Sequence, residues 1–121
     1  METIYAKLGD KELQKLIDEF YNRVFESPVI GGLFANSIKE EVKDKQFSFL
    51  TQFLGGPPRY IEKYGNPMMR RRHLPHRITI EAKEEWLELM HEAIQTLSIE
   101  DDLKNALYLC FPKLAEHMVN S

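Results

Sequence analysis

Apolar residues recur along most of the chain at spacings of three and four, the pattern of an α-helix with one buried face. The pattern predicts a first long helix from about Asp10 to Glu26, with Asp10 as its N-cap because a carboxylate there accepts backbone N–H groups. Ser27 and Pro28 end this helix, since a residue before proline avoids the helical conformation. The predicted buried face consists of Leu13, Leu16, Ile17, Phe20, Tyr21, Val24 and Phe25.

A second helix is predicted to begin near Ser37 or Ile38, with Ser37 as its cap. It should stop at residues 55–58, a run of two glycines and two prolines. The following segment, residues 59–77, is expected to be irregular, with room for one or two short helical turns. The expected buried face of the second helix carries Ile38, Val42, Gln46, Phe49, Leu50 and Phe53.

Two further helices are predicted later in the chain. One runs from its cap Thr79 to about Thr96, and the last runs from Ile99 or Glu100 to Met118 with a kink at Pro112. No window alternates as a half-buried strand does, so the expected fold is all-α, in one domain over residues 1–121. The long irregular segment needs more than its own backbone bonds to hold it, and a bound cofactor would do so. The expected buried stripes are Trp86, Leu87, Met90, Ala93, Ile94 and Leu97, then Leu103, Leu107, Cys110, Phe111, Leu114 and Met118.

Composition narrows the functional classes. The chain has 121 residues, 43% of them hydrophobic, and a formal net charge of -3, so one globular domain is expected and general nucleic-acid binding is disfavoured. Its single cysteine, Cys110, excludes an intramolecular disulfide and a cysteine metal cage. The sequence has neither a signal-peptide pattern nor an apolar stretch of membrane-spanning length. It therefore predicts a soluble, cytoplasmic protein with no membrane partner.

Three hydrogen-bonding side chains lie on otherwise apolar predicted faces: Tyr21 on the first helix, Gln46 on the second and Trp86 on the third. Each alone is compatible with a core side chain whose polar atom reaches a backbone group, a water or the rim. A buried amide left without a partner costs about 1–3 kcal/mol. Together the three are typical of a polar spot inside an apolar small-molecule pocket.

Candidate chemistry among the other polar residues is limited. No zinc-type spacing relates the histidines, and no nucleophile elbow of a hydrolase occurs. Cys110 lies on a helix stripe, as an inert core thiol would. A single histidine is nevertheless enough to coordinate an iron that a macrocycle already holds. The histidines are His73, His76, His91 and His117.

The run Arg70-Arg71-Arg72 beside His73 has three interpretations. It could be a solvated basic turn, a nucleic-acid contact, or a site for an anionic group such as a porphyrin carboxylate, bound by charge-assisted hydrogen bonds.

The segment FLTQFLGGPPRYIEKYGNPMMRRRHLPHRIT, together with Trp86 and with Tyr21 in the upstream pair Phe20-Tyr21, resembles the group II truncated hemoglobins. The resemblance extends over nearly the whole chain, from Tyr5 to Asn120. It implies a truncated globin fold, a two-on-two helical sandwich around heme. In that fold a largely irregular segment carries the iron-binding histidine.

The resemblance also implies roles for individual residues. The metal ligand is expected at His73, and the hydrogen-bonding residues on the ligand side of the heme at Tyr21, Gln46 and Trp86. Further heme contacts are expected at Phe34 after the first long helix, Val42 at the ligand gate, Met69 on the histidine side, and at the propionate partners Lys45, Arg72 and Tyr60.

The implied function is reversible binding of O2, and also of NO and CO, at the iron of heme b. Hydrogen bonds from Tyr21 and Trp86 would slow oxygen release, with Gln46 orienting Tyr21 or the ligand. Strong retention favours oxygen-linked redox chemistry, such as nitric oxide oxidation or a peroxidase-like reaction with an electron-donating reductase, over bulk oxygen transport. Two alternatives stay open: a ligand sensor or oxygen store without turnover, and a heme-free helical interaction module. A monomer or a homodimer is expected.

Overall fold

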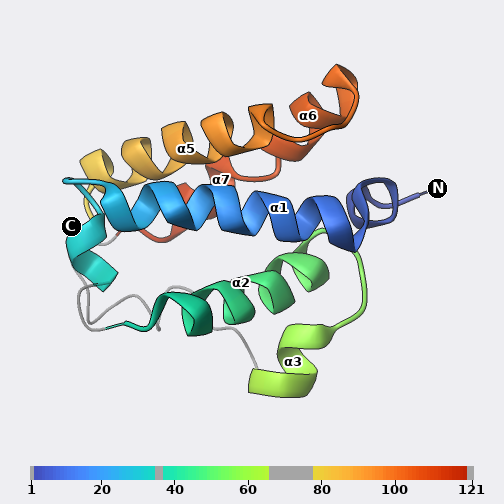
Figure 1. Ribbon diagram of the computed structural model, residues 1–121, viewed down its shortest axis with the longest axis horizontal. Helices are drawn as coiled ribbons and strands as arrows, with labels where there is room; N and C mark the ends of the chain where they lie inside the picture. Colours follow the sequence, from blue (N-terminus) through green and yellow to red (C-terminus); the bar gives the residue numbers. More distant parts are fainter. Residues whose placement is uncertain (1, 35–36, 66–77, 120–121) are drawn as a thin grey trace.

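A computed structural model describes residues 2–34, 37–65 and 78–119 of the chain. In these ranges the chain forms helices and no strand, which confirms the predicted all-α class. Figure 1 shows the elements in chain order, coloured from blue to red. They are α1 (Ile4–Glu26), the 3-10 helix η1 (Gly31–Phe34), α2 (Lys39–Phe53), α3 (Arg59–Tyr64), α5 (Ile80–Gln95), α6 (Asp101–Tyr108) and α7 (Pro112–His117).

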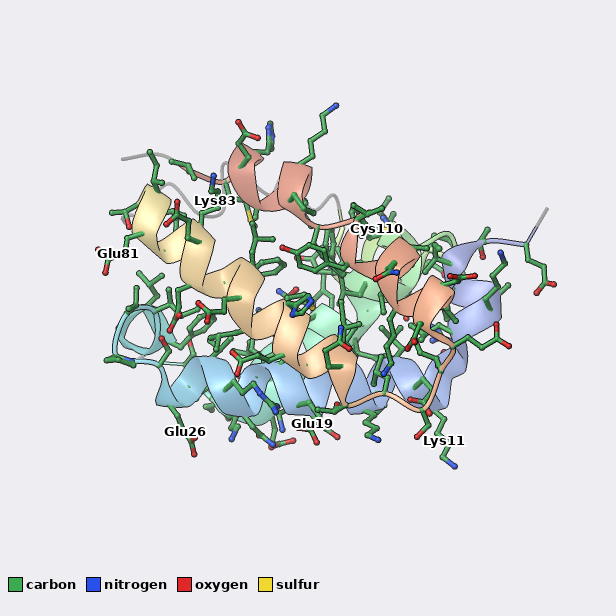
Figure 2. The ribbon with its side chains drawn as sticks, turned by 90° about the horizontal axis from the view of Figure 1, so that it is seen from above. Lys11, Glu19, Glu26, Glu81, Lys83 and Cys110 are labelled. Atoms are coloured by element: carbon green, nitrogen blue, oxygen red, sulfur yellow. The ribbon has the colours of Figure 1, made fainter. Side chains whose placement is uncertain are left out.

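Helix α1 is the central element. It packs against α2 on one side and against α5 on the other, while α6 and α7 pack against α5 (Figure 1). The charged side chains of Lys11, Glu19 and Glu26 point away from the neighbouring helices (Figure 2). The opposite face is the one that the sequence pattern predicts, with Phe25 half-buried and the others buried. The buried residues of that face are Leu13, Leu16, Ile17, Phe20, Tyr21 and Val24.

The beginning of α1 differs from the prediction. The helix starts at Ile4, where the Thr3 hydroxyl accepts a hydrogen bond from the Ala6 N–H at 3.0 Å. It is interrupted at Gly9, whose φ of 80° and ψ of 162° are not helical. The prediction that Asp10 caps the first helix was wrong, because other groups take up its carboxylate.

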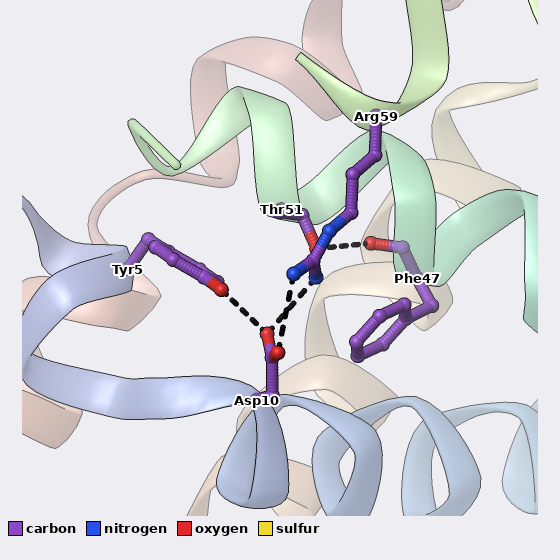
Figure 3. A network of polar contacts seen from close by, with 5 residues as sticks. All are labelled: Tyr5, Asp10, Phe47, Thr51 and Arg59. Carbon is purple, nitrogen blue, oxygen red and sulfur yellow. Dashed lines mark hydrogen bonds and ion pairs between the residues drawn. The ribbon is translucent and has the colours of Figure 1, made fainter. Parts of the chain in front are cut away.

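Both oxygens of the Asp10 carboxylate bind side chains from elsewhere (Figure 3). Tyr5 donates its hydroxyl proton to Oδ1 at 2.6 Å, and Arg59 donates from Nη1 to Oδ1 at 3.0 Å and from Nη2 to Oδ2 at 3.2 Å. The bonds from Arg59 and then Tyr5 lower the pKa of Asp10. Arg59 also donates to Thr51 Oγ1 at 3.4 Å, so the network joins the start of α1 to α2 and α3.

The N-cap residue of α2 is Ile38, which makes no side-chain cap hydrogen bond, so the prediction of Ser37 as cap was wrong. Its end is confirmed: the helix stops at Phe53, and Gly55 follows with a φ of 95°. Helix α3 is one of the short turns expected in the segment 59–77. Residues 66–77 of that segment lie outside the described residues.

Helix α5 begins as predicted, with the Thr79 hydroxyl accepting from the Ala82 N–H at 2.9 Å. The predicted last helix is instead two helices, α6 and α7. Pro112 lies in the first turn of α7 rather than at a kink within one helix. Proline is tolerated there because the first N–H groups of a helix have no intrahelical acceptor.

Within the described ranges, no helix combines the length and the apolarity needed to cross a membrane.

Gly56 gives the fold a testable close contact. A Cβ at this position would lie 2.5 Å from the Tyr5 ring and 2.9 Å from the Thr51 carbonyl oxygen, so Gly56→Ala requires the start of α1 to shift. We expect it to lower the free energy of unfolding by about 1–3 kcal/mol in urea titrations, as overpacking does. The matched control is Gly32→Ala, because a Cβ at Gly32 meets no atom within 4 Å. Equal unfolding midpoints for the two variants would contradict this packing.

Candidate functional site

A cavity of about 100 Å³ lies between α1, η1, α2, α5 and α7. Apolar side chains form most of its wall. Because these helices are far apart in the sequence, the cavity exists only when they are packed together. Its apolar lining includes Phe20, Ile30, Leu33, Phe49, Leu50 and Met90.

Tyr21 from α1, Gln46 from α2 and Trp86 from α5 interrupt this apolar wall with hydrogen-bonding groups. Within the described part of the chain, none of the three side chains is hydrogen-bonded to protein. In that part of the chain, every side-chain nitrogen or oxygen that is fully buried has a hydrogen-bond partner. The Tyr21 hydroxyl has no partner, so it must adjoin open space even though Tyr21 as a whole is largely buried. The cavity therefore offers unpaired hydrogen-bonding groups to a ligand.

Tyr21 is held as a neutral donor. Its side chain is only 4% exposed, and burial raises its pKa well above the ordinary value because desolvation disfavours the phenolate. Its ring packs edge-on against Phe20, with centroids 4.8 Å apart, and against Phe34 at 6.2 Å. These contacts restrict the ring, and the hydroxyl keeps its proton at neutral pH.

Trp86 is fixed by aromatic neighbours in a similar way. Its ring lies 5.0 Å from the centroid of Phe20 and 5.7 Å from that of Phe111, both edge-to-face. Edge-to-face geometry is favourable for aromatic pairs, and Phe20 thereby contacts both Tyr21 and Trp86. The two donors are thus positioned through one shared ring.

The structure brings together four of the predicted site residues: Tyr21, Phe34, Gln46 and Trp86 line the cavity. The other three described residues lie elsewhere. Val42 is half-buried against the core, Lys45 is exposed with its Nζ 5.6 Å from the centroid of the Tyr64 ring, and Tyr60 is buried with its ring 5.8 Å from Phe49.

Predicted residues in the segment 66–77 lie outside the described residues. They are Met69, the basic run Arg70-Arg71-Arg72, His73 and His76. Of the other histidines, His91 and His117 are both exposed. In the ranges 2–34, 37–65 and 78–119, no group of three His, Cys, Asp or Glu side chains could hold a metal ion.

Other lining residues were not predicted as site residues. Met90 and Met118 were predicted only as members of buried helix stripes. Ala82 lies four residues before Trp86 on the same face of α5, so helical periodicity could have identified it. Ile30 belongs to a short connection, where no periodic signal exists, and only tertiary packing brings it to the cavity.

Comparison with known proteins agrees with this architecture. The bacterial-like globin family matches residues 3–120. The chain is 40% identical over 116 residues to "Group 2 truncated hemoglobin YjbI" of Bacillus subtilis (strain 168), covering 96% of this chain and 87% of that protein. It is 39% identical over 120 residues to "Group 2 truncated hemoglobin 3-1" of Lotus japonicus, covering 97% of this chain and 71% of that protein.

Solved structures give the same result. The crystal structure of the group II truncated hemoglobin from Bacillus anthracis superposes with a TM-score of 0.93 at 35% identity, covering 100% of this chain and 93% of that one. The truncated oxygen-avid haemoglobin from Bacillus subtilis superposes with a TM-score of 0.92 at 40% identity, covering 98% and 100%. The fold is therefore the predicted two-on-two arrangement.

The raised pKa of Tyr21 predicts a loss of stability in alkali. The unfolded chain releases this proton near pH 10, while the folded chain retains it, so the free energy of unfolding decreases as the pH rises above 10. Between pH 10 and pH 11 we expect the wild type to lose about 1 kcal/mol more than Tyr21→Phe does. Urea unfolding at a series of pH values measures this difference. Parallel pH profiles for the two proteins would show that Tyr21 is not protected from ionisation.

Proposed function

Because the chain belongs to the bacterial-like globin family, we propose that it binds heme b and holds O2, and also NO or CO, at the iron. Membership of a globin family implies heme-based binding of a small ligand such as oxygen. One observation carries the proposal for this chain. Tyr21, Gln46 and Trp86 surround a small apolar cavity without protein partners among the described residues.

The cavity fits the ligand side of a heme site. Its volume of about 100 Å³ is small beside ordinary small-molecule pockets of about 300–1,000 Å³, and suits a ligand of a few atoms. Its walls are apolar, which suits the faces of a porphyrin, and its polar groups are few and convergent. The described residues therefore fit the ligand side of a heme that binds a diatomic ligand.

The residues that would hold the heme follow from the resemblance to group II truncated hemoglobins. His73 would coordinate the iron, with Met69 packed nearby, and Phe34 and Val42 would contact the heme on the ligand side. Lys45, Arg72 and Tyr60 would pair with its propionates. Lys45 is exposed and has no ion pair within the described residues, so its charge is available for a carboxylate.

When bound, heme supplies the iron at which a diatomic ligand coordinates. The chain itself supplies the hydrogen bonds. Tyr21 and Trp86 donate to a polarised ligand in the cavity, and Gln46 orients Tyr21 or the ligand. Because the cavity wall is mostly apolar, each bond is stronger than it would be in solvent. Ligand release is therefore slow when the ligand carries partial negative charge.

Slow release supports oxygen-linked redox chemistry rather than bulk transport. Nitric oxide oxidation or a peroxidase-like reaction fits, with electrons from a separate reductase. A sensor or an oxygen store would show the same binding without turnover. Steady-state consumption of NO by the oxygenated protein with a reductase supplied distinguishes the two: sustained consumption supports turnover, and a single stoichiometric burst supports sensing or storage.

The assignment of His73 is tested by removing its ring. His73→Gly should bind heme more weakly, and added imidazole should restore a five-coordinate ferrous spectrum, because the free ring replaces the missing ligand. His91→Ala is the control, since His91 is exposed on α5 and its ring centroid lies 5.3 Å from that of Tyr108 on α6. Normal heme retention and an unchanged iron–histidine stretch in His73→Gly would exclude His73 as the ligand.

The ligand-side donors are tested by comparing O2 with CO. A hydrogen bond to a strongly polarised acceptor contributes about 1.5–3 kcal/mol, so its loss should speed O2 release about 10- to 100-fold. Bound CO carries much less charge, so its release should change little. We expect this pattern in stopped-flow dissociation from Tyr21→Phe and Trp86→Phe, with a larger effect in the double variant if one donor compensates for the other.

Tyr108→Phe is the matched control for Tyr21→Phe. Tyr108 is a half-buried tyrosine of α6 that packs on His91, does not line the cavity and has no proposed heme contact, so loss of its hydroxyl should leave O2 release unchanged. If the double variant Tyr21→Phe with Trp86→Phe releases O2 at the wild-type rate, these residues are core side chains without a role in ligand retention.

A further inference from the structure

Ser27, at the end of α1, makes hydrogen bonds through every polar group that it has. Its N–H donates to the Val24 carbonyl at 3.1 Å, and its own carbonyl accepts from the Gly31 N–H at 2.9 Å. Its hydroxyl oxygen accepts from the N–H groups of Val29 at 3.2 Å and Ile30 at 3.3 Å. These bonds fold the connection from α1 into η1 around a single residue.

The hydroxyl proton of Ser27 leaves this connection. It is donated to Glu85 Oε2 at 2.6 Å, on α5, 58 residues further along the chain. A serine hydroxyl has one proton and two lone pairs, so a bond to Glu85 leaves the oxygen free to accept the two N–H groups. A short bond to a carboxylate is among the stronger hydrogen bonds in proteins. Glu85 therefore orients the hydroxyl on which the connection depends.

This contact joins two walls of the cavity. The end of α1, marked by Glu26, and the start of α5, marked by Glu81, lie at the same end of the molecule (Figure 2). Ile30, whose N–H is bound by Ser27, is 2% exposed and lines the cavity. Trp86, which follows Glu85 directly, lines it from the other wall.

We propose that Ser27 and Glu85 are positioning residues that hold α5 against the α1–η1 connection and so set where the Trp86 indole N–H points in the cavity. The inference rests on the proposed function, because Trp86 matters as a donor only if a ligand occupies the cavity. Neither Ser27 nor Glu85 lines the cavity, so both act through Trp86 rather than on the ligand.

The connection leaves little room for compensation. A Cβ at Gly31 would lie 3.1 Å from the Phe25 carbonyl oxygen and 3.2 Å from that of Val24, so the backbone there is already tightly packed. Loss of the bond between Ser27 and Glu85 cannot be offset by a closer approach of this backbone to α1. When this hydrogen bond is lost, the added motion would instead occur in α5, at Trp86.

The test measures O2 and CO dissociation from the holoprotein by stopped flow. Ser27→Ala and Glu85→Ala should each speed O2 release about 2- to 10-fold, the range for a weakened neutral hydrogen bond, and change CO release much less. In a Trp86→Phe background the same substitutions should have no further effect on O2 release. This loss of effect is the mark of action through Trp86.

Conservative variants and a neighbour provide the controls. Ser27→Thr keeps a hydroxyl and Glu85→Gln keeps an acceptor oxygen, so both should release O2 at close to the wild-type rate. Glu84→Ala removes an adjacent exposed carboxylate of α5 and should have no effect. The second readout is hydrogen exchange at the indole N–H of Trp86, the single tryptophan of the chain, which should be faster in Ser27→Ala and Glu85→Ala.

Three results would overturn the inference: unchanged O2 release, an equal increase in O2 and CO release, or an effect that persists in the Trp86→Phe background. Each would mean that the pair serves only to stabilise the fold. Failure of the proposed function would look different, because the wild-type protein itself would then show no Soret band after heme addition and no O2 binding. The indole exchange would still report whether the pair positions Trp86.

Discussion

Burial of one face of α1 between α2 and α5 is the constraint on which the rest of the structure depends. Leu13, Leu16, Ile17 and Val24 are fully buried along this face. Burying a side chain of this size contributes about 1.5–3 kcal/mol. Among the helices that the structure describes, only α1 packs extensively against both α2 and α5. Because α1 is shared, any residue on its buried face is brought near both α2 and α5.

Burial of this face of α1 also places a polar group, the Tyr21 hydroxyl, at the cavity. Tyr21 lies on the buried face of α1, and its ring packs with Phe20 and Phe34. Its hydroxyl has no hydrogen-bond partner among the described residues. A buried hydroxyl without a partner is costly, so a site of this kind is stabilised when a ligand accepts its hydrogen bond. The proposed ligand binding would use a group that the core would otherwise exclude.

Polar contacts around the core fix how the helices meet. Lys43, which is largely buried on α2, reaches Asn22 at 3.2 Å and Asp18 at 3.3 Å on α1. Arg59 ties the start of α1 to α2 and α3 through Asp10. Ser27 ties the end of α1 to α5. Apolar burial favours the association of these helices without direction, whereas the hydrogen bonds select the particular arrangement that forms the cavity.

The sequence by itself determined the all-α class, the long helices α1, α2 and α5 and most of their buried faces, because helical periodicity depends only on residues three and four apart. Ile38 and Phe53, at the two ends of the predicted α2 face, are instead exposed. The sequence also identified Tyr21, Gln46 and Trp86, since a polar residue on an apolar stripe is visible without coordinates. The assignment of His73 comes from the resemblance of its segment to a known family, and it stays a prediction.

Tertiary structure decided what depends on distant partners. Asp10 could not be recognised as a partner of Arg59, nor Ser27 of Glu85, because each pair is far apart in the sequence. The division of the predicted last helix at Pro112 was also decided by tertiary structure. Proline has no backbone N–H to donate, so it breaks a helix interior but is tolerated in the first turn of a helix, where Pro112 lies. Convergence of four predicted residues on one cavity required the helices to be packed, since a cavity is a property of several elements together.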